Sequence, residues 1–257
     1  MKALAGSTWG QEKETLTLTY KSICRSTLEY GSPVWGPAIS DTSWDKLQRI
    51  QNQALRISSG CHMMSDIDHL HQETKVLPLR AHSEMPTKQF LAACHLPGHP
   101  GQKHLGKPTP QRNLSQHHTL LDYEPEVSSL FPAEINKQAY KAAIKALHTS
   151  TVANSLQSYN PNNVLLRHPP NISVDETNLS RKERTSLAQL RSGYSKLLNS
   201  YLFRINGTPD VCPLCSESPH DSHHLFNCRE NPTNLTVTDL WTKPRAAASF
   251  LKLADPD

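Results

Sequence analysis

Apolar residues recur every three or four positions in several stretches of the chain, the spacing that places side chains on one face of an α-helix. In residues 11–29 these positions are Leu16, Tyr20, Ile23 and Cys24. The glycines and prolines of LEYGSPVWGP then interrupt the pattern, because neither residue type continues a helix well. The sequence therefore predicts a first helix that ends before this turn.

The clearest helix of the first half is predicted over residues 41–60. Asp41 or Ser43 is a suitable N-terminal cap, and Gly60 is a suitable end. The apolar stripe of this helix consists of Trp44, Leu47, Ile50, Ala54 and Ile57. Such a stripe is typical of a helix that packs one face on a core.

Two further helical stretches are predicted in the second half. Residues 133–148, rich in Ala and Lys, are typical of an amphipathic helix. In the last stretch, Ser180 and Glu183 have the spacing of a capping box, and Gly193 divides the pattern into two helices. Its apolar positions are Leu187, Leu190, Tyr194, Leu198, Tyr201 and Ile205.

Composition favours helical modules joined by irregular stretches, because the apolar fraction is only 36% and the chain has 19 prolines. From about residue 61 to 130 the sequence is rich in His and Pro, which is typical of a loop-rich connector. We predict a mainly α fold. Its segments are a helical region over 1–94, an irregular connector over 95–132, a helix and linker over 133–178, and basic helices with a metal-binding module over 179–257.

The net charge, the apolar runs and the cysteine positions indicate which partners and which cellular compartment to expect. A net charge of +4 permits a nucleic-acid partner without implying one. The sequence has no apolar run of signal-peptide or membrane-spanning length, so we expect an intracellular protein, nuclear or cytoplasmic, without a membrane partner. Cys24, Cys61 and Cys94 are far apart and the other three cysteines share one loop, which argues against a disulfide framework.

That loop, CPLCSESPHDSHHLFNC at residues 212–228, has the spacing of a metal site. Cys212 and Cys215 form a C-x2-C pair, and two thiolates at this separation can reach one tetrahedral zinc ion at about 2.3 Å. Cys228 offers a third sulfur. For the fourth ligand the spacing leaves three histidines open, namely His220, His223 and His224. Three thiolates and one imidazole close the coordination shell, so we expect a structural zinc site that contributes on the order of 10 kcal/mol to folding.

Basic residues are concentrated on two of the predicted helices. The first group lies roughly opposite the apolar stripe of residues 41–60, and the second leads into the cysteine loop. One interpretation of both groups is a solvated surface, and the other is contact with the phosphates of a nucleic acid. The candidate phosphate-binding residues are Lys46, Arg49, Arg56, Arg181, Lys182, Arg184, Arg191, Lys196 and Arg204.

Two sets of motifs resemble the reverse transcriptases of non-LTR retrotransposons of the LINE type, jockey-like elements in particular. The first is similar to the segment that follows the catalytic palm in that family: a Tyr-Gly-x-Pro-x-Trp turn, a Leu-Gln-x-x-Gln-Asn-x-Ala-Leu-Arg helix ending in Gly, and DHLHQET at residues 68–74. The matching residues before DHLHQET are Tyr30, Gly31, Pro33, Trp35, Leu47, Gln48, Gln51, Asn52, Ala54, Leu55, Arg56 and Gly60.

The second set is RTSLAQLRSGYSKLLNSYLFRI, the cysteine loop and LTVTDLWTKPRAAASFL, which resemble the terminal zinc module of the same family, in the same order. In that family the ligand histidine directly precedes Leu-Phe-x-Cys, so the resemblance selects His224 over His223. It implies a Cys-Cys-His-Cys site formed by Cys212, Cys215, His224 and Cys228. The resemblance covers nearly the whole chain and is weakest across residues 95–170.

The resemblance also implies what this chain lacks. The polymerases of the family copy RNA into DNA with paired aspartates that hold two catalytic magnesium ions, and the chain has no Asp-Asp pair. We therefore expect no catalytic residue, no activity of the chain alone, and magnesium only in a full-length parent polymerase. The expected role is a C-terminal fragment of an RNA-directed DNA polymerase. It would bind RNA or DNA and act beside the missing N-terminal polymerase and endonuclease domains.

Two other functions fit the same residues. The chain could be a zinc-stabilised module that binds another protein, because closed zinc modules serve nucleic-acid binding, protein binding and scaffolding alike. It could also be the non-functional remnant of a decayed element. The first alternative predicts no binding of single-stranded RNA at low salt.

Overall fold

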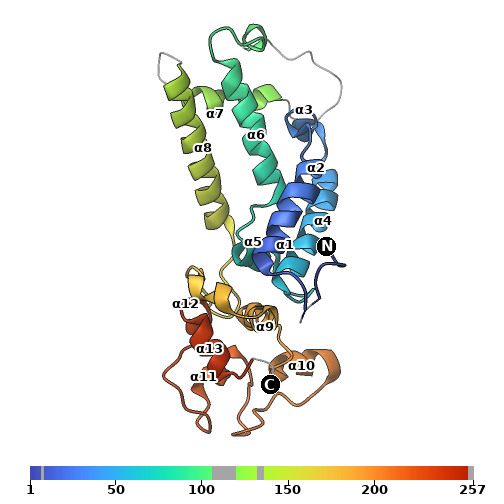
Figure 1. Cartoon of the computed structure of the whole chain (residues 1–257), viewed down its shortest axis with the longest axis vertical. Coiled ribbons are helices and arrows are strands. Elements are labelled where there is room, and N and C mark those ends of the chain that lie inside the picture. Colours follow the sequence, from blue (N-terminus) through green and yellow to red (C-terminus); the bar gives the residue numbers. More distant parts are fainter. Residues whose placement is uncertain (7–8, 106–119, 132–135, 254–257) are drawn as a thin grey trace. The chain divides into compact units, whose positions relative to one another are not determined.

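The computed structural model describes residues 1–6, 9–105, 120–131 and 136–253, and the regular elements within these residues are helices (Figure 1). The predicted mainly α fold is confirmed. Among the described helices, none is both long and apolar enough to cross a membrane.

Two compact units each combine segments that are distant in sequence. The first contains Met1–Lys21, Asn52–Val76 and Asn160–Asp257, and the second contains Ser22–Gln51 and Leu77–Tyr159. Helix α4 (Asp41–Ser59) and the π-helical turn η1 (Tyr20–Arg25) carry residues of both. The predicted division followed chain order, whereas these units follow packing, so parts of the predicted 1–94 region share a unit with the predicted 179–257 module.

The second unit is organised around helix α6 (Leu79–Cys94). Leu91 and Ala92 of α6 form a small core with Val127, against which Tyr140 and Ile144 of α8 pack. The other helices of this unit are α2 (Ser26–Leu28), α3 (Ser32–Trp35), η2 (Gly36–Ala38), η3 (Gln102–His104), η4 (Leu120–Tyr123), α7 (Glu124–Ser128) and α8 (Lys137–Ser158).

Helix α8 confirms the predicted amphipathic helix and extends beyond it. Asn136 caps its start, because the Asn136 Oδ1 accepts hydrogen bonds from two backbone amides of the first turn. The helix continues to Ser158, past the predicted end at residue 148. The predicted start at residue 133 lies outside the described residues, as do residues 106–119 of the predicted connector.

The loop-rich interpretation of residues 61–130 is wrong for about their first half, where α5 (Ile67–Thr74) and α6 form. Pro86 lies inside α6, although the proline content of residues 61–130 had suggested a loop. Burial explains why α6 still forms, since Leu79, Met85 and Leu91 all pack inward. The remaining described part of the connector contains the short helices η3, η4 and α7.

Helix α4 begins and ends close to the predicted positions. Its cap is Ser40, whose Oγ accepts the Ser43 amide at 3.3 Å, in place of the predicted Asp41 or Ser43. Gly60 ends the helix with φ of 74°. The apolar stripe is partly wrong, because Ile50 is 49% exposed and Leu55 is fully buried.

The first unit holds an extended hydrophobic core. Leu187 and Leu190 of α9 pack with Leu240 and Trp241 in this core. The predicted capping box of Ser180 and Glu183, and the division at Gly193, are confirmed. Besides α4 and α5, its helices are α1 (Lys13–Thr19), η5 (Val174–Asn178), α9 (Arg181–Ser192), α10 (Asn199–Asn206), α11 (Ser222–Asn227), α12 (Asp239–Thr242) and α13 (Pro244–Phe250).

Candidate metal centre

The four predicted ligands come together in the first unit. Donor atoms of Cys212, Cys215, His224 and Cys228 all lie within 4.8 Å of one another. The Sγ atoms of Cys212 and Cys228 are 3.8 Å apart, and Cys215 Sγ is 3.3 Å from His224 Nε2. The three sulfurs belong to free, buried cysteines. The cluster could therefore hold one metal ion.

These distances fit a tetrahedral ion with sulfur ligands. For zinc–sulfur bonds of about 2.3 Å, two sulfurs at the corners of a tetrahedron lie about 3.8 Å apart. The separation of Cys212 and Cys228 matches that edge, and it is far too long for a disulfide. The cluster is compatible with zinc, and its donor set of soft sulfur and one nitrogen does not suit magnesium or calcium.

A tight backbone turn holds the first two cysteines. The Cys212 amide donates to the Glu217 carbonyl at 2.8 Å, and the Ser216 amide donates to the Cys212 carbonyl at 2.9 Å. Ser216 completes the turn with φ of 61°. Leu214 at the tip of the turn is 59% exposed. The turn thus aims both sulfurs inward while its tip faces solvent.

The local electrostatics favour a thiolate in this turn. Burial by itself raises the pKa of the Cys212 thiol, but the backbone N–H groups of Cys215 and Leu214 outweigh burial and lower that pKa to about 6. For Cys215, burial and the neighbouring Cys212 sulfur raise the pKa to about 11. A bound cation would favour deprotonation of Cys215, since metal ligands bind as thiolates.

The choice among the three histidines follows from α11. Asp221 caps this helix, since its Oδ1 accepts the His224 amide at 2.9 Å, and this fixes the first turn that carries His224. His223 points elsewhere, because its Nε2 donates to the Val164 carbonyl at 2.7 Å. The His220 Nδ1 accepts the Asn199 amide at 3.1 Å, and His220 lies outside the ligand cluster.

The segment around the ligands is less isolated than its polar sequence suggests. Phe226 is buried in the core of the first unit, where its ring stacks on Phe250 at 5.9 Å. The Ser222 hydroxyl donates to the Leu190 carbonyl of α9 at 2.9 Å. The helical end of this segment therefore has a hydrophobic anchor besides the candidate metal site. The turn around Cys212 and Cys215 lacks such an anchor.

Three of the predicted phosphate-binding arginines are buried, which contradicts that role. Arg181 donates to the backbone carbonyls of Gly6, Ile57 and Ser58. Arg184 forms ion pairs with Glu12 and Glu14. Their sequence neighbours gave no sign of this, because the partners lie more than a hundred residues away.

Arg191 is the most deeply buried of the three. Its side chain is 0% exposed and is paired with Glu73 of α5 and Glu176 of η5. Lys13 of α1 joins the same two carboxylates at 3.0 and 2.7 Å. The Leu240 carbonyl accepts from the guanidinium as well. Charges from four segments therefore neutralise one another, as buried charges require.

The remaining predicted basic residues lie nearer the surface. Lys46 and Arg49 of α4, and Lys196 and Arg204 around α10, are exposed. Arg56 is half-buried, and its guanidinium donates to the Ser65 carbonyl at 3.3 Å. Lys182 is half-buried too and has a partner. For the four exposed residues, phosphate contact stays a prediction.

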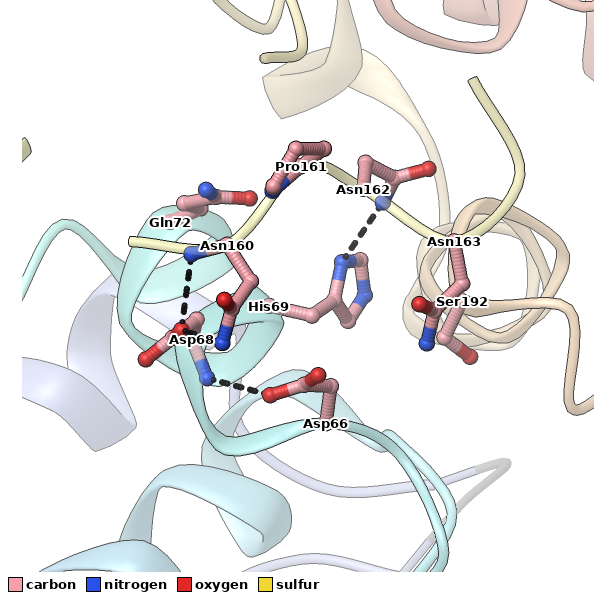
Figure 2. A pocket seen from close by; sticks show the side chains of 9 residues that line it. All are labelled: Asp66, Asp68, His69, Gln72, Asn160, Pro161, Asn162, Asn163 and Ser192. Carbon is pink, nitrogen blue, oxygen red and sulfur yellow. Dashed lines mark hydrogen bonds between the residues drawn. The ribbon is translucent and has the colours of Figure 1, made fainter. Parts of the chain in front are cut away.

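The DHLHQET segment forms several hydrogen bonds with other segments of the first unit (Figure 2). Asp68 accepts hydrogen bonds from the backbone and side-chain amides of Asn160 at 2.9 Å. His69 lies on the adjacent turn, donates from Nε2 to the Ala188 carbonyl at 3.2 Å and faces Asn162. Beside them is a cavity of about 10 Å³, lined in part by Asp66 and Ser192 and large enough for about one water molecule. The family resemblance of this segment gave no sign of this packing role.

Comparison of the chain with models of protein families, with curated proteins and with solved structures found no match.

Proposed function

We propose that the chain is a C-terminal part of an RNA-directed DNA polymerase of the non-LTR retrotransposon type, that it is non-catalytic by itself, and that it binds RNA or DNA beside a structural zinc site. One observation carries the proposal. The closed cluster of three cysteines and one histidine belongs to the same compact unit as DHLHQET, although the two motifs are far apart in sequence. Two motifs that resemble one family thus take part in one folding unit.

The other resembling residues have specific packing roles, which also supports the proposal. In the second unit, the Tyr30 carbonyl accepts a hydrogen bond from Trp35 Nε1 at 2.8 Å, and Gly31 between them has φ of 69°. Trp35 packs on Trp44 at 5.4 Å between ring centroids. The glycine of the motif thus occupies a left-handed position, which favours glycine, and the tryptophan of the motif closes the turn onto the Tyr30 carbonyl.

The proposed zinc ion would be structural. Four protein donors fill a tetrahedral shell, which leaves no position for a reacting water. Cys212, Cys215, His224 and Cys228 would hold the ion and thereby order the turn at Leu214. Nucleic acid would then contact the surface formed by this turn and α10, which Asn199 connects through its side-chain bond to the Val211 carbonyl at 2.6 Å.

That surface combines charge with exposed apolar groups. Lys196 and Arg204 are exposed cations, and Phe203 is 57% exposed between them in sequence. Unpaired bases stack on exposed aromatic rings while lysine and arginine contact phosphates. We expect weak sequence preference and binding that falls steeply with salt.

A filter-binding titration of the full chain with a 20-nucleotide single-stranded RNA at low salt tests the proposal. Wild-type protein should retain the RNA and contain one zinc ion per chain. Cys215→Ser should lose the metal and most of the binding. K196Q/R204Q should keep the metal and lose binding, whereas the matched variant K75Q/R245Q, at exposed positions elsewhere in the first unit, should bind normally.

A protein-binding function is the second candidate, and the apolar character of the same surface favours it. Besides Phe203, the exposed apolar residues of α10 and the adjoining turn include Leu197, Ile205, Val211 and Leu214. Exposed apolar groups of this kind are typical of protein interfaces. Wild-type protein that contains zinc but retains neither RNA nor DNA at low salt would favour this candidate and contradict the first.

A further inference from the structure

Helix α8 carries a straight row of lysines that the predicted nucleic-acid contacts did not include. Lys137, Lys141 and Lys145 are spaced four residues apart, so they lie within about 80° of one another around the helix and about 6 Å apart along it. All three are exposed, and His148 continues the row. We call Lys137, Lys141 and Lys145 the α8 lysine row.

Among the residues that the structure describes, this row has no counter-charge. The 22 residues of α8 include no Asp or Glu, and none of the three lysines forms an ion pair with another described residue. Like charges four residues apart destabilise a helix by about 0.2–0.5 kcal/mol per pair. Lys137 also occupies the first helical position, where the helix dipole disfavours a cation. The fold thus tolerates a charge arrangement that an external anion would relieve.

The surroundings of the row indicate which anion. Between and beside the lysines the exposed residues are small or polar, namely Gln138, Ala142, Ala146, Thr149 and Ser150. A helix that lies on a membrane, or that docks on a protein, needs large apolar side chains along its contact face. A linear row of cations without such anchors suits a linear array of phosphates, which is contacted by charge alone.

We infer that the α8 lysine row binds the phosphodiester backbone of a nucleic-acid strand. The inference deepens the proposed function, on which it rests, because it adds a second contact surface in the other compact unit. The row lies beside the inward face of α8, which includes Tyr140, Ala143, Ile144 and Leu147, and its three lysines are exposed to solvent. Contacts to successive phosphates would fix the strand along the helix without reading its bases.

Binding of a 20-nucleotide oligo(U) RNA to the full chain, measured at several salt concentrations, tests the inference. Each phosphate contact to a single strand contributes about 0.7 to the slope of log K against log salt, so three contacts contribute about 2. K137Q/K141Q/K145Q should lower the slope by about that amount. Glutamine keeps helix propensity close to that of lysine, and circular dichroism should confirm unchanged helix content.

The matched control is K75Q/K103Q/K252Q, which removes the same charge from three exposed lysines outside the row. Its slope should change by much less than that of the row variant. An equal change in both triple variants would overturn the inference, since net charge would then explain the effect. Unchanged RNA binding by the row variant would overturn it too, while wild-type binding would still support the proposed function.

If wild-type protein does not bind RNA, both the inference and the proposed function are overturned. Two other anionic ligands are tested in the same way, namely vesicles that contain phosphatidylserine and, separately, soluble polyglutamate. Binding of either one, lost in the row variant while RNA binding persists, would assign the row to a membrane or an acidic protein and contradict a nucleic-acid strand. A loss confined to RNA and to oligo(dT) of the same length would support the inference, because RNA and DNA share the phosphodiester backbone.

Discussion

Arg191 of α9 donates from a guanidinium nitrogen to Glu73 of α5 at 2.9 Å, and both side chains are buried, at 0% and 1% exposure. The two residues are 118 positions apart in sequence. Glu73 is the penultimate residue of the DHLHQET motif, and Arg191 belongs to the stretch that leads into the cysteine loop. This buried ion pair therefore joins two of the three segments of the first unit.

Removal of the arginine should destabilise the first unit strongly. In Arg191→Met, Glu73 and Glu176 would remain buried with Lys13 as their main counter-charge, and an uncompensated buried charge costs about 3–5 kcal/mol. Urea unfolding of the full chain measures the change. The control Arg204→Met, at an exposed position, should stay within about 0.5 kcal/mol of wild type. If Arg191→Met were equally mild, the buried pairing would be wrong.

Stability should fall in acid because of the same cluster. Burial alone would raise the pKa of Glu73, but Arg191 and Lys13 outweigh it and hold that pKa well below its usual value of 4.5. A carboxylate with a lowered folded-state pKa stabilises the protein above its unfolded pKa, and this contribution is lost as pH falls below about 4.5. Thermal melts between about pH 6 and 3 should show this loss, with a shallower slope for Glu73→Gln.

Neighbouring histidines provide a direct test of the metal site. His224→Gln removes the nitrogen that lies 3.3 Å from Cys215 Sγ, so bound zinc should fall well below one ion per chain. His223→Gln should retain the ion, because His223 faces the Val164 carbonyl instead. Elemental analysis of both purified proteins makes the comparison. Metal loss in the His223 variant with retention in the His224 variant would reverse the assignment.

Local signals in the sequence predicted several helix ends, although α5 and α6 formed in a stretch predicted to be loop-rich. The capping box at Ser180 and Glu183, the helix end at Gly60 and the clustering of the four ligands each depend on residues within about twenty positions. Such signals act through local backbone geometry, so a short window of sequence is enough to recognise them. The identity of the metal, the family resemblance and nucleic-acid binding remain predictions.

Tertiary pairing could not be predicted in the same way. The stretch around Arg191 contains many cations and one acid, which made a basic surface plausible. Its actual partners, Glu73 and Glu176, come from other segments, and no local pattern connects them to α9. The prediction that Ile50 belongs to the buried stripe of α4 was wrong for a related reason. Which face of α4 is buried depends on α6 and α9, and not on α4 alone.

Gly60 and Gly207 have the same backbone conformation but different surroundings, so substituting each one separates the cost of backbone strain from the cost of packing. Both glycines end a helix with φ of 74°, so alanine at either one should cost about 1–2 kcal/mol of backbone strain. A Cβ at Gly207 would meet no atom within 4 Å, whereas a Cβ at Gly60 would lie 2.4 Å from Thr185 Oγ1 of α9. Gly60→Ala should therefore lower the free energy of unfolding by about 1–3 kcal/mol more than Gly207→Ala. Urea unfolding of both variants measures this difference, and Thr185→Ala should restore part of the loss in the Gly60 variant. Equal costs for the two glycine variants would mean that α4 does not end against α9.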